Sequence, residues 1–378
     1  MSEAYLFNKN RVLLKTEFKN GEVLEILDAD EKNKKYLPLF LQDNLTVDNV
    51  NKWLKTRKIP DTREGLEDAR KYFPGFDRHS NWHMFSLSDQ YWFRHKPTEK
   101  WEDLNYFTNR YSQEQGKIFF EPWDANVSEA VRAEGPDLTT NGVLKKRWVQ
   151  NPDGVSYLLK AGSIKYHQEP LSEVMASIAL SKIGLMPFVR YDLTVYGLTL
   201  CSRCRNFVTQ DTEFVPASHL FWAAKRPPNV SAVQHFYSLC EERRILGAKD
   251  YITNMVAIDR ILCNGDRHFG NFGFIRNADT GEILGFAPLF DFGRAYFASN
   301  EVQDKTSKFF GDIQEECFLK FMRKMGRADR FNVAGLKKAA SSYPGITEKE
   351  SEMIRRRVNN VYREIREVTE VGIYQAGL

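Results

Sequence analysis

The feature that most constrains this chain is a pair of polar motifs separated by a short gap. Gly265–Asn271 reads GDRHFGN, and Ala287–Gly293 reads APLFDFG. An aspartate, an asparagine five residues later and an Asp-Phe-Gly are the side chains that phosphoryl transfer from ATP requires. In this pattern Asp266 orients the acceptor hydroxyl and accepts its proton, while Asn271 and Asp291 hold magnesium against the phosphates. The motifs therefore predict a kinase-type site.

The segment between the motifs predicts a β-hairpin. Phe272–Asn277 and Glu282–Phe286 have the composition of strands, and the residues between them are typical of a turn. Because a hairpin returns the chain to its starting point, we expect Asp291 to lie beside Asn271, where both can bind one metal ion. The alternative interpretation is a polar turn in which Asp266 and Asn271 only cap backbone groups.

The composition is that of a folded chain large enough for two domains or a bilobed one. Of the 378 residues, 42% are hydrophobic and 28% are charged, so a large core can form. The net charge of +4 suits an acidic ligand such as a nucleotide and gives no basis for nucleic-acid binding. The N-terminus shows no secretory signal, and Met175–Val189, the longest apolar stretch, is too short and too polar to span a bilayer. We therefore expect no membrane contacts.

The five cysteines indicate a reducing compartment. Their odd number and wide spacing do not form a disulfide framework, so we expect a cytoplasmic protein. Cys201 and Cys204 have the spacing of a zinc or redox pair, but neither a second pair nor a nearby histidine completes a site. We expect these two thiols to lie on opposite faces around a strand end.

Residues 1–125 predict an accessory region of mixed α and β structure. The expected elements are strands at Tyr5–Phe7, Arg11–Phe18 and Val23–Leu27, a helix at Thr46–Thr56 and a second helix that opens at Pro60. Asn81–Trp123 is rich in aromatic residues, which without a basic excess indicates a core or a seam between domains rather than base stacking. The polar stretch Asp124–Gly135 is the expected boundary.

Residues 126–209 predict the smaller lobe of a kinase. The expected elements are a loop with Thr139, Thr140 and Gly142, then strands at Val143–Gln150 and Val155–Ala161, and later strands at Tyr191–Cys201 and Arg205–Thr209 with a hinge at Cys204–Phe207. Lys160 ends an apolar strand, where its ammonium can neutralise nucleotide phosphates. The alternative is a lysine that extends from a sheet edge into solvent.

A helix with Pro170 near its start and Gly184 at its end follows Lys160. Glu173 is expected in its first turn, where the helix dipole favours a carboxylate even without a function. The more specific hypothesis is an ion pair between Glu173 and Lys160 that positions the lysine for catalysis, with Glu169 as the rival partner.

Residues 210–378 predict a mainly helical lobe, because apolar residues recur at three- and four-residue intervals. The expected helices are Val230–Leu246, Lys249–Leu262, Asp312–Met325, Val333–Ser341 and Thr347–Thr369. The second of these leads directly into the loop with Asp266. Thr347 and Glu350 form a capping box at the start of the last one.

Gly265–Asn271 followed by Ala287–Asp291 resembles the catalytic and metal-binding pair of HipA-like bacterial serine/threonine kinases. Those kinases carry a Gly-Asp-x-His-x-x-Asn loop and an Ala/Thr-Pro-Leu-Tyr-Asp strand end. The resemblance covers roughly residues 138–320 and is most specific in these two motifs. It implies a bilobed, protein-kinase-like α+β fold with an antiparallel-sheet N-lobe, a mainly helical C-lobe and an extra N-terminal region. It also implies ATP and Mg²⁺ as cofactors and a protein hydroxyl as the acceptor.

The resemblance also implies roles for individual residues. Asp266 corresponds to the catalytic base, Asn271 and Asp291 to the metal ligands, and Lys160 to the phosphate-binding lysine. The helix with Glu173 falls where the family places its glutamate. His268 would hold the catalytic loop in shape, and the alternative is a histidine packed under the loop without a catalytic role.

The loop with Thr139, Thr140 and Gly142 is the segment that could cover the phosphates, as the non-standard loop of that family does. The resemblance implies that the enzyme phosphorylates one of these two threonines, and the added charge would then expel the loop. The alternative is that both are β-branched strand residues. The chain lacks a Gly-x-Gly-x-x-Gly, a His-Arg-Asp and an Ala-Pro-Glu motif. Control by phosphorylation of an activation loop is therefore not expected, and an antitoxin-like regulator is an expectation from the resemblance only.

Other functions share part of this pattern. Phosphatidylinositol-type lipid kinases have a similar Gly-Asp-Arg-His-x-x-Asn loop with Asp-Phe-Gly, and antibiotic phosphotransferases resemble it more loosely. A lipid kinase should carry a basic or amphipathic membrane-facing stretch, whereas the basic residues here are interspersed with acidic ones. The third class is a pseudokinase or interaction module. The retention of Lys160, Asp266, Asn271 and Asp291 together argues against it.

Overall fold

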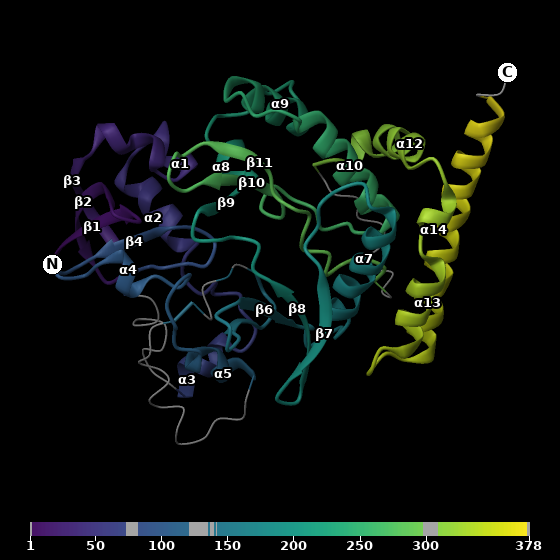
Figure 1. Ribbon diagram of the computed structural model, residues 1–378, viewed down its shortest axis with the longest axis horizontal. Coiled ribbons are helices and arrows are strands. Elements are labelled where there is room, and N and C mark those ends of the chain that lie inside the picture. Colours follow the sequence, from purple (N-terminus) through teal and green to yellow (C-terminus); the bar gives the residue numbers. More distant parts are fainter. Residues whose placement is uncertain are drawn as a thin grey trace. The chain divides into compact units, whose positions relative to one another are not determined.

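The computed structural model describes residues 2–72, 82–120, 135–136, 140, 142–297 and 309–375. The chain is an α+β protein with antiparallel sheets, as the sequence predicts (Figure 1). It forms two compact units. Unit 1 contains residues 1–161, 195–225 and 274–284, and unit 2 contains residues 162–194, 226–273 and 285–378. The predicted domain boundaries near residues 125 and 209 stay predictions.

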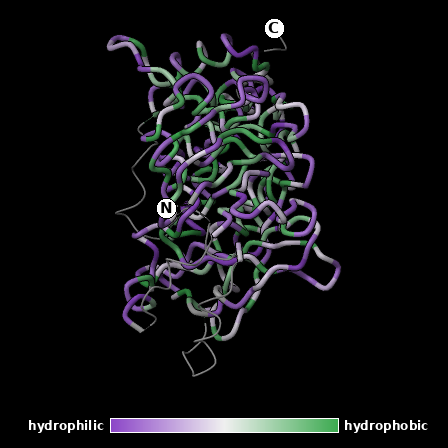
Figure 2. The backbone as a smooth tube through the Cα atoms, turned by 90° about the vertical axis from the view of Figure 1, so that its left-hand side faces the viewer, coloured by the Kyte–Doolittle hydropathy of each residue, from purple (hydrophilic) through white to green (hydrophobic). Residues whose placement is uncertain are grey.

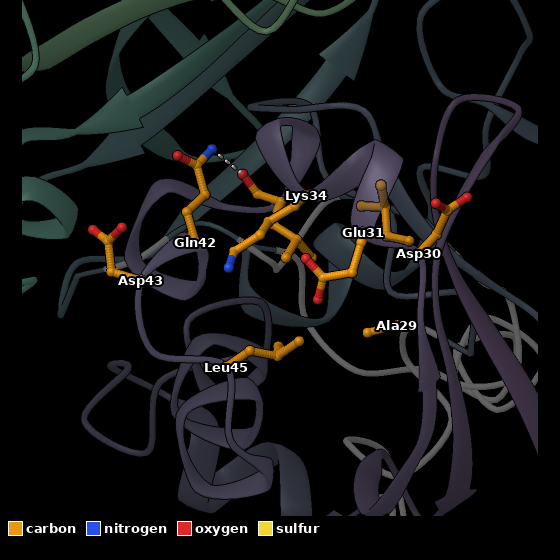
Figure 3. Close-up of a pocket in the computed structure, with 9 residues that line it drawn as sticks. Ala29, Asp30, Glu31, Lys34, Gln42, Asp43 and Leu45 are labelled. Carbon is orange, nitrogen blue, oxygen red and sulfur yellow. Dashed lines mark hydrogen bonds between the residues drawn. The ribbon is translucent and has the colours of Figure 1, made fainter.

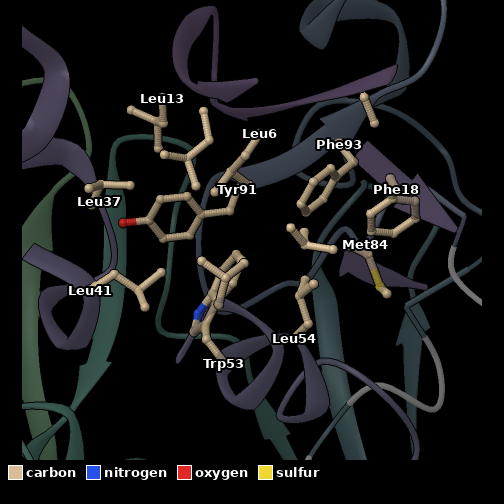
Figure 4. Packing of buried hydrophobic residues seen from close by; sticks show 14 residues of the cluster. Leu6, Leu13, Phe18, Leu37, Leu41, Trp53, Leu54, Met84, Tyr91 and Phe93 are labelled. Atoms are coloured by element: carbon tan, nitrogen blue, oxygen red, sulfur yellow. The ribbon is translucent and has the colours of Figure 1, made fainter. Parts of the chain in front are cut away.

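The N-terminal sheet of unit 1 has the strand order β3-β2-β1-β4. Its strands are β1 (Ser2–Asn8), β2 (Arg11–Lys19), β3 (Glu22–Ala29) and β4 (Tyr91–Arg94), so the predicted hairpin is confirmed. Helix α2 (Val47–Lys55) packs on β3 and begins where the Thr46 hydroxyl accepts a hydrogen bond from Asn49 N at 3.2 Å. Figure 4 shows the buried side chains, among them Trp53 and Tyr91, that fill the space between sheet and helix.

Shorter helices complete the N-terminal part of unit 1. They are η1 (Glu31–Tyr36), α1 (Leu39–Gln42), α3 (Leu66–Tyr72), α4 (Trp101–Leu104), α5 (Glu114–Phe120) and α8 (Ala217–Phe221). The helix predicted to open at Pro60 begins only at Leu66, because the residues between them form turns. The aromatic residues of the segment Asn81–Trp123 form a core around Phe85, Trp92 and Trp101, as predicted. Most of the predicted boundary segment, residues 124–134, lies outside the described residues.

The second sheet has the strand order β5-β6-β8-β7. Its strands are β5 (Lys146–Gln150), β6 (Ser156–Ala161), β7 (Tyr191–Tyr196) and β8 (Thr199–Arg205). The single strand predicted over Tyr191–Cys201 is wrong, because Gly197 adopts a left-handed φ of 56° and turns the chain into a hairpin. The strand predicted at Arg205–Thr209 is also wrong beyond Arg205, where β8 ends.

The third sheet, β11-β10-β9, contains the predicted hairpin between the two motifs. Its strands are β9 (Thr212–Pro216), β10 (Gly273–Asn277) and β11 (Ile283–Phe286). The buried Arg276 of β10 donates to Glu213 of β9, with 2.9 Å between Nε and Oε2. Its Nη1 donates to the carbonyl oxygen of Leu37 at 2.9 Å. These contacts anchor the hairpin to the N-terminal part of unit 1.

Unit 2 is built mainly from helices. They are α7 (Glu169–Ile183), α9 (Ala232–Glu242), α10 (Ala248–Ile261), α12 (Gln314–Met325), α13 (Val333–Ser342) and α14 (Glu348–Gln375), with η3 (Gly311–Ile313) and η4 (Ala328–Arg330) between them. Gly184 ends α7 with a φ of 62°. Glu173 does not lie in the first turn of α7, because the helix begins at Glu169. The capping box is confirmed, since Thr347 N donates to Glu350 Oε2 at 2.8 Å and Glu350 N donates to Thr347 Oγ1 at 3.2 Å.

Hydrophobic and hydrophilic residues alternate at short intervals along the chain (Figure 2). No helix in the described ranges is long and apolar enough to cross a membrane. A small cavity of about 70 Å³ lies in unit 1 beside α1, with Leu13 and Leu45 among its lining residues (Figure 3). Gln42 closes one side by donating to the carbonyl oxygen of Leu37 at 3.0 Å. The cavity has room for a few water molecules at most and contains none of the predicted site residues.

Candidate active site

The loop with Asp266 is anchored in unit 2 by aromatic residues. Helix α10 leads into it, and Phe269 and Phe272 of the loop are fully buried. Both rings pack against Phe236 of α9, with centroid distances of 5.4 and 5.6 Å, and against Phe310 at 5.5 and 6.0 Å. Because these rings occupy the core, they fix the position of Asn271 between them and of the exposed Asp266 and His268 before them. The alternation of aromatic and polar residues thus positions the motif.

Asp266, Asn271 and Asp291 are brought together within unit 2. The side-chain amide of Asn271 donates to the backbone carbonyl of Asp266 at 3.3 Å. Arg267 Nη1 donates both to the carbonyl of Asn271 at 2.6 Å and to the carbonyl of Phe290, directly before Asp291, at 2.8 Å. One guanidinium nitrogen therefore joins the two predicted metal ligands through their backbones.

Arg267 was not among the predicted site residues, and it is the structural centre of the loop. Its side chain is almost fully buried, and Asp259 of α10 accepts from its Nε at 2.8 Å and from its Nη2 at 3.0 Å. Its guanidinium also lies 4.9 Å from the centroid of the Phe292 ring. Asn264 Nδ2 donates to Asp259 at 2.8 Å, so the same carboxylate also holds the start of the loop.

We expect Arg267→Met to lower the free energy of unfolding by about 3–5 kcal/mol, because it leaves the buried Asp259 carboxylate without its partner. Urea unfolding followed by circular dichroism measures this change. Lys320→Met is the matched control. It breaks the exposed pair with Glu316 on α12 and should leave the free energy of unfolding nearly unchanged. A loss below about 1 kcal/mol in Arg267→Met would contradict the role of this pair.

Asp291 has an unusual backbone conformation. Its φ is 61°, in the left-handed region that residues other than glycine rarely adopt. The conformation is held from both sides. The carbonyl before Asp291 accepts from Arg267, and the N–H of Phe292 after it donates to Glu173 Oε2 at 2.9 Å. The two contacts turn the Asp291 side chain away from the direction that a regular strand would give it.

Asp266 lies at the exposed surface of the loop and has an altered acidity. Loss of solvation on its protein-facing side, and then the negative charge of Asp291, raise the pKa of Asp266 above its ordinary value. His268 when protonated, and the positive charges of Arg294 and Arg267, oppose this rise. A carboxyl whose proton affinity is raised in this way is better suited to accept a proton during a reaction.

The raised pKa gives a pH prediction. A base must be deprotonated to act, so kcat/KM should fall as the pH is lowered through the raised pKa of Asp266, above the ordinary aspartate value of 3.8. We would measure ATP turnover against pH and follow the fold by circular dichroism at each point. Activity that stays constant down to the ordinary aspartate pKa, in folded protein, would be inconsistent with Asp266 as the base.

His268 makes a contact within the loop. Its Nδ1 accepts a hydrogen bond from the N–H of Gly270 at 3.0 Å, and a Cβ at position 270 would lie 2.9 Å from the ring. Glycine at this position therefore makes room for the imidazole. The contact is what a loop-holding role requires, while a direct catalytic role of His268 stays a prediction.

The two glutamates of α7 have different surroundings within unit 2. Glu173 is buried and accepts from Phe292 N, as described above. Glu169 is also buried, and its Oε2 accepts from Ser163 N at 2.9 Å. The Glu169 side chain lies against Gly293 of the Asp-Phe-Gly, where a Cβ would be 3.6 Å from it. Both glutamates are thus next to the second motif. Lys160 belongs to unit 1, and its predicted ion pair with Glu173 stays a prediction.

Lys160 lies within unit 1 on one face of the second sheet. Its neighbours Leu159 and Ala161 point to the other face, where they form a core with Phe119 and Phe120 of α5. Directly opposite Lys160 lie Lys146 on β5 and Ser202 on β8. Side chains directly opposite each other on neighbouring strands share a face and lie about 5 Å apart at Cβ. The three polar residues therefore form one row, and all three are buried.

Lys146 was not among the predicted site residues. A Cβ at Gly142 would lie 2.6 Å from Lys146 Nζ, so this ammonium lies against the loop predicted to cover phosphates. Gly142 itself has a φ of 109°, which requires glycine. The carbonyl of Thr140 accepts from the Arg63 guanidinium, whereas Thr139 lies outside the described residues. The hairpin register, which pairs Gln150 with Ser156, would have revealed Lys146 opposite Lys160.

The predicted magnesium ligands are oxygen donors of the kind that Mg²⁺ prefers. Magnesium is usually held by one or two protein oxygens together with phosphate oxygens and water. The Asn271 amide nitrogen donates to Asp266, which leaves its amide oxygen and the Asp291 carboxylate as the donors. No group of three or more His, Cys, Asp or Glu side chains in the described ranges could hold a metal alone. Asn271 and Asp291 therefore fit a magnesium ion that is shared with a nucleotide.

No protein-family model matches the chain, and no curated protein matches it in sequence. Several solved structures are similar in fold, among them the following two. The first is HipA of Shewanella oneidensis MR-1, solved in a complex of the toxin–antitoxin proteins HipA and HipB with operator DNA. It is 12% identical to this chain, with a TM-score of 0.56. The match covers 97% of this chain and 99% of that chain. The chain has the fold of HipA. The Helicobacter pylori proinflammatory kinase CtkA is 17% identical with a TM-score of 0.49, over 62% of this chain and 95% of that chain.

The similarity to HipA extends over nearly the whole chain. It therefore includes the N-terminal region, which showed no evident match at the level of sequence motifs. The expectation that the resemblance begins near residue 138 is corrected by this finding. The two chains therefore share a fold at 12% identical residues.

Proposed function

We propose that this chain is an ATP- and magnesium-dependent phosphotransferase, a HipA-like serine/threonine kinase that transfers the γ-phosphoryl group of ATP to a protein hydroxyl. The observation that carries the proposal is the linkage of the two motifs within unit 2. Arg267 joins the carbonyl of Asn271 to the carbonyl before Asp291, and the Asn271 amide donates to the carbonyl of Asp266. The HipA fold supports it, because a kinase-like fold implies a nucleotide site. The five cysteines are all free thiols, which supports a reducing, cytoplasmic location.

In this proposal Asp266 accepts the proton of the acceptor hydroxyl, which its raised pKa favours. Asn271 and Asp291 would hold magnesium, which supplies positive charge to the phosphate oxygens when bound. Lys160 would bind the nucleotide phosphates, and we add Lys146 beside it as a second phosphate-binding lysine. Two ammonium groups in one row suit a ligand with several negative charges. Glu173 would position Lys160, and Thr139, Thr140 and Gly142 would cover the phosphates.

The experiment that tests the function locates the transferred group. Pure protein is incubated with γ-labelled ATP and magnesium in a bacterial extract, and the label is then traced to protein, lipid or small molecules. We expect label on serine or threonine of a protein. Label on lipid would favour the phosphatidylinositol-type alternative, and label on a small molecule would favour a small-molecule phosphotransferase. ATP binding without any transfer would indicate a pseudokinase.

A further part of the proposal is an antitoxin-like regulator. The solved HipA complex contains a second protein, HipB, and operator DNA. The likeness of fold over nearly the whole chain supports a search for a protein partner of this chain. Co-purification of the chain with the product of its neighbouring gene, followed by an activity assay with and without that product, tests this part. We propose no direct nucleic-acid binding by the chain itself.

We also predict self-modification of the phosphate-covering loop. After incubation with ATP, mass spectrometry should find phosphate on Thr139 or Thr140 in the wild type and not in Asp266→Asn. The modified protein should have lost turnover, because up to about two added charges repel the ATP phosphates. The Thr140 hydroxyl is buried and has no hydrogen-bond partner among the described residues, so the loop must move before this hydroxyl can accept a phosphoryl group. If neither threonine gains phosphate in active protein, this prediction is wrong and the kinase proposal stands without it.

A further inference from the structure

Arg294 directly follows the Asp-Phe-Gly motif and has no role in the proposal above. Its guanidinium lies over two aromatic rings, with Cζ 4.9 Å from the centroid of Phe297 and 5.7 Å from the centroid of Tyr166. The two rings meet edge to face at a centroid distance of 5.2 Å. Stacking on ring faces restricts the orientation of a guanidinium but uses none of its N–H groups.

The N–H groups of Arg294 are open to a ligand. Arg294 is half-buried, and it makes no hydrogen bond or salt bridge with any residue in the described ranges. Arg267, the other arginine of the two motifs, differs in this respect. Its guanidinium donates to Asp259 and to two backbone carbonyls, so it is committed to holding the loop.

The surroundings of Arg294 within unit 2 are rich in negative charge. Asp291 lies three residues before it, and the buried Glu169 lies against Gly293, with an Oε1 that has no hydrogen-bond partner among the described residues. Arg294 thus belongs to the same short segment of unit 2 as the proposed metal ligand Asp291.

We propose that Arg294 binds the transferring phosphoryl group, a role that rests on the proposed phosphotransferase function. In that step the bond between the γ-phosphorus and the bridging oxygen of ATP breaks, and ADP leaves with the electron pair. A bond forms between the acceptor oxygen and the phosphorus, and the acceptor proton passes to Asp266. The planar guanidinium can donate two parallel hydrogen bonds to phosphoryl oxygens, where negative charge is spread during the transfer.

The test compares Arg294→Gln, Arg294→Lys and Arg294→Ala with the wild type in two measurements. The first is ATP turnover with magnesium and with water as the acceptor, which needs no knowledge of the protein substrate. The second is calorimetric affinity for ADP alone and for ADP with aluminium fluoride, which imitates the phosphoryl group in flight. Arg323→Gln is the matched control, since Arg323 is an exposed arginine of α12 in the same unit.

We expect Arg294→Gln to lower turnover by about a hundredfold and the affinity for ADP with aluminium fluoride by at least about tenfold. Its affinity for ADP alone should change by less than about threefold, because the role is confined to the transferred group. Arg294→Lys should recover part of the turnover. Added guanidinium ion should restore part of the turnover of Arg294→Ala, and Arg323→Gln should match the wild type.

Turnover within about threefold of the wild type in Arg294→Gln would overturn the inference and leave the proposed function in place. An equal loss of affinity for ADP and for ADP with aluminium fluoride would also overturn it, because Arg294 would then serve ground-state binding or structure. Wild-type protein that binds ATP with magnesium and transfers no phosphoryl group would refute the proposed function, and this inference with it. The three results are distinct.

Discussion

We expect Asp266→Asn to lower ATP turnover by at least about a hundredfold while nucleotide affinity stays within about threefold of the wild type. The asparagine has nearly the same shape but cannot accept the acceptor proton. The substitution should leave the loop intact, because Asn271 bonds to the backbone carbonyl of Asp266 and not to its side chain. Steady-state turnover and calorimetry with a non-hydrolysable ATP analogue measure the two quantities.

The control for this prediction is Asp250→Asn. Asp250 is an exposed aspartate in the first turn of α10, the helix that leads into the loop. Its substitution removes one negative charge from the same unit and should leave turnover unchanged. Equal turnover of Asp266→Asn and the wild type would refute Asp266 as the base.

The second large effect concerns the proposed metal site. We expect Asp291→Asn to abolish most of the gain in nucleotide affinity that magnesium provides, at least about tenfold, because the neutral amide replaces the carboxylate that faces metal and phosphates. Calorimetric titration of the nucleotide with magnesium and with a chelator measures this gain. An unchanged magnesium-dependent affinity would show that Asp291 does not hold the metal.

Asparagine is the better substitution here because of the backbone. Asp291 has a φ of 61°, in the left-handed region. Asparagine tolerates this conformation, whereas for alanine it raises the free energy of the folded state by about 1–2 kcal/mol. Asp291→Ala should therefore lose both the magnesium effect and about 1 kcal/mol of unfolding free energy. Asp291→Asn should lose the magnesium effect alone. Urea unfolding of both variants separates the loss of a ligand from the loss of a backbone conformation.

The site could be predicted from the sequence where its geometry is local. The hairpin β10–β11 closes within a few residues, so the proximity of Asn271 and Asp291 follows from strand and turn composition. Lys160 could be placed on the face opposite Leu159 and Ala161 because side chains alternate along a strand. The same reasoning extended by one strand would have included Lys146.

Other features depend on contacts that no local pattern shows. The pairing of Arg267 with Asp259 joins a loop to the preceding helix, and an arginine between two polar residues is usually exposed. The left-handed φ of Asp291 results from Arg267 on one side and Glu173 on the other. Neither contact has a sequence signature of its own.

The fold itself was predictable by class and less so by boundaries. The helices of unit 2 follow their apolar periodicity, and the strands β1 to β3 follow their turn residues. Gly197 was missed as the turn between β7 and β8, because a lone glycine in an apolar run also occurs inside strands. The N-terminal similarity to HipA was missed because it lies in the arrangement of elements at 12% identity.

The most direct test of the account follows the phosphorus atoms of ATP by magnetic resonance in the presence of magnesium and the pure wild-type chain. We expect the γ-phosphate signal to decline as ADP signals grow together with a phosphoester or inorganic phosphate signal. We expect no such change when magnesium is chelated or when Asp266→Asn replaces the wild type. An ATP spectrum that stays unchanged with the wild-type chain, under conditions where calorimetry shows that magnesium and ATP are bound, would contradict the account.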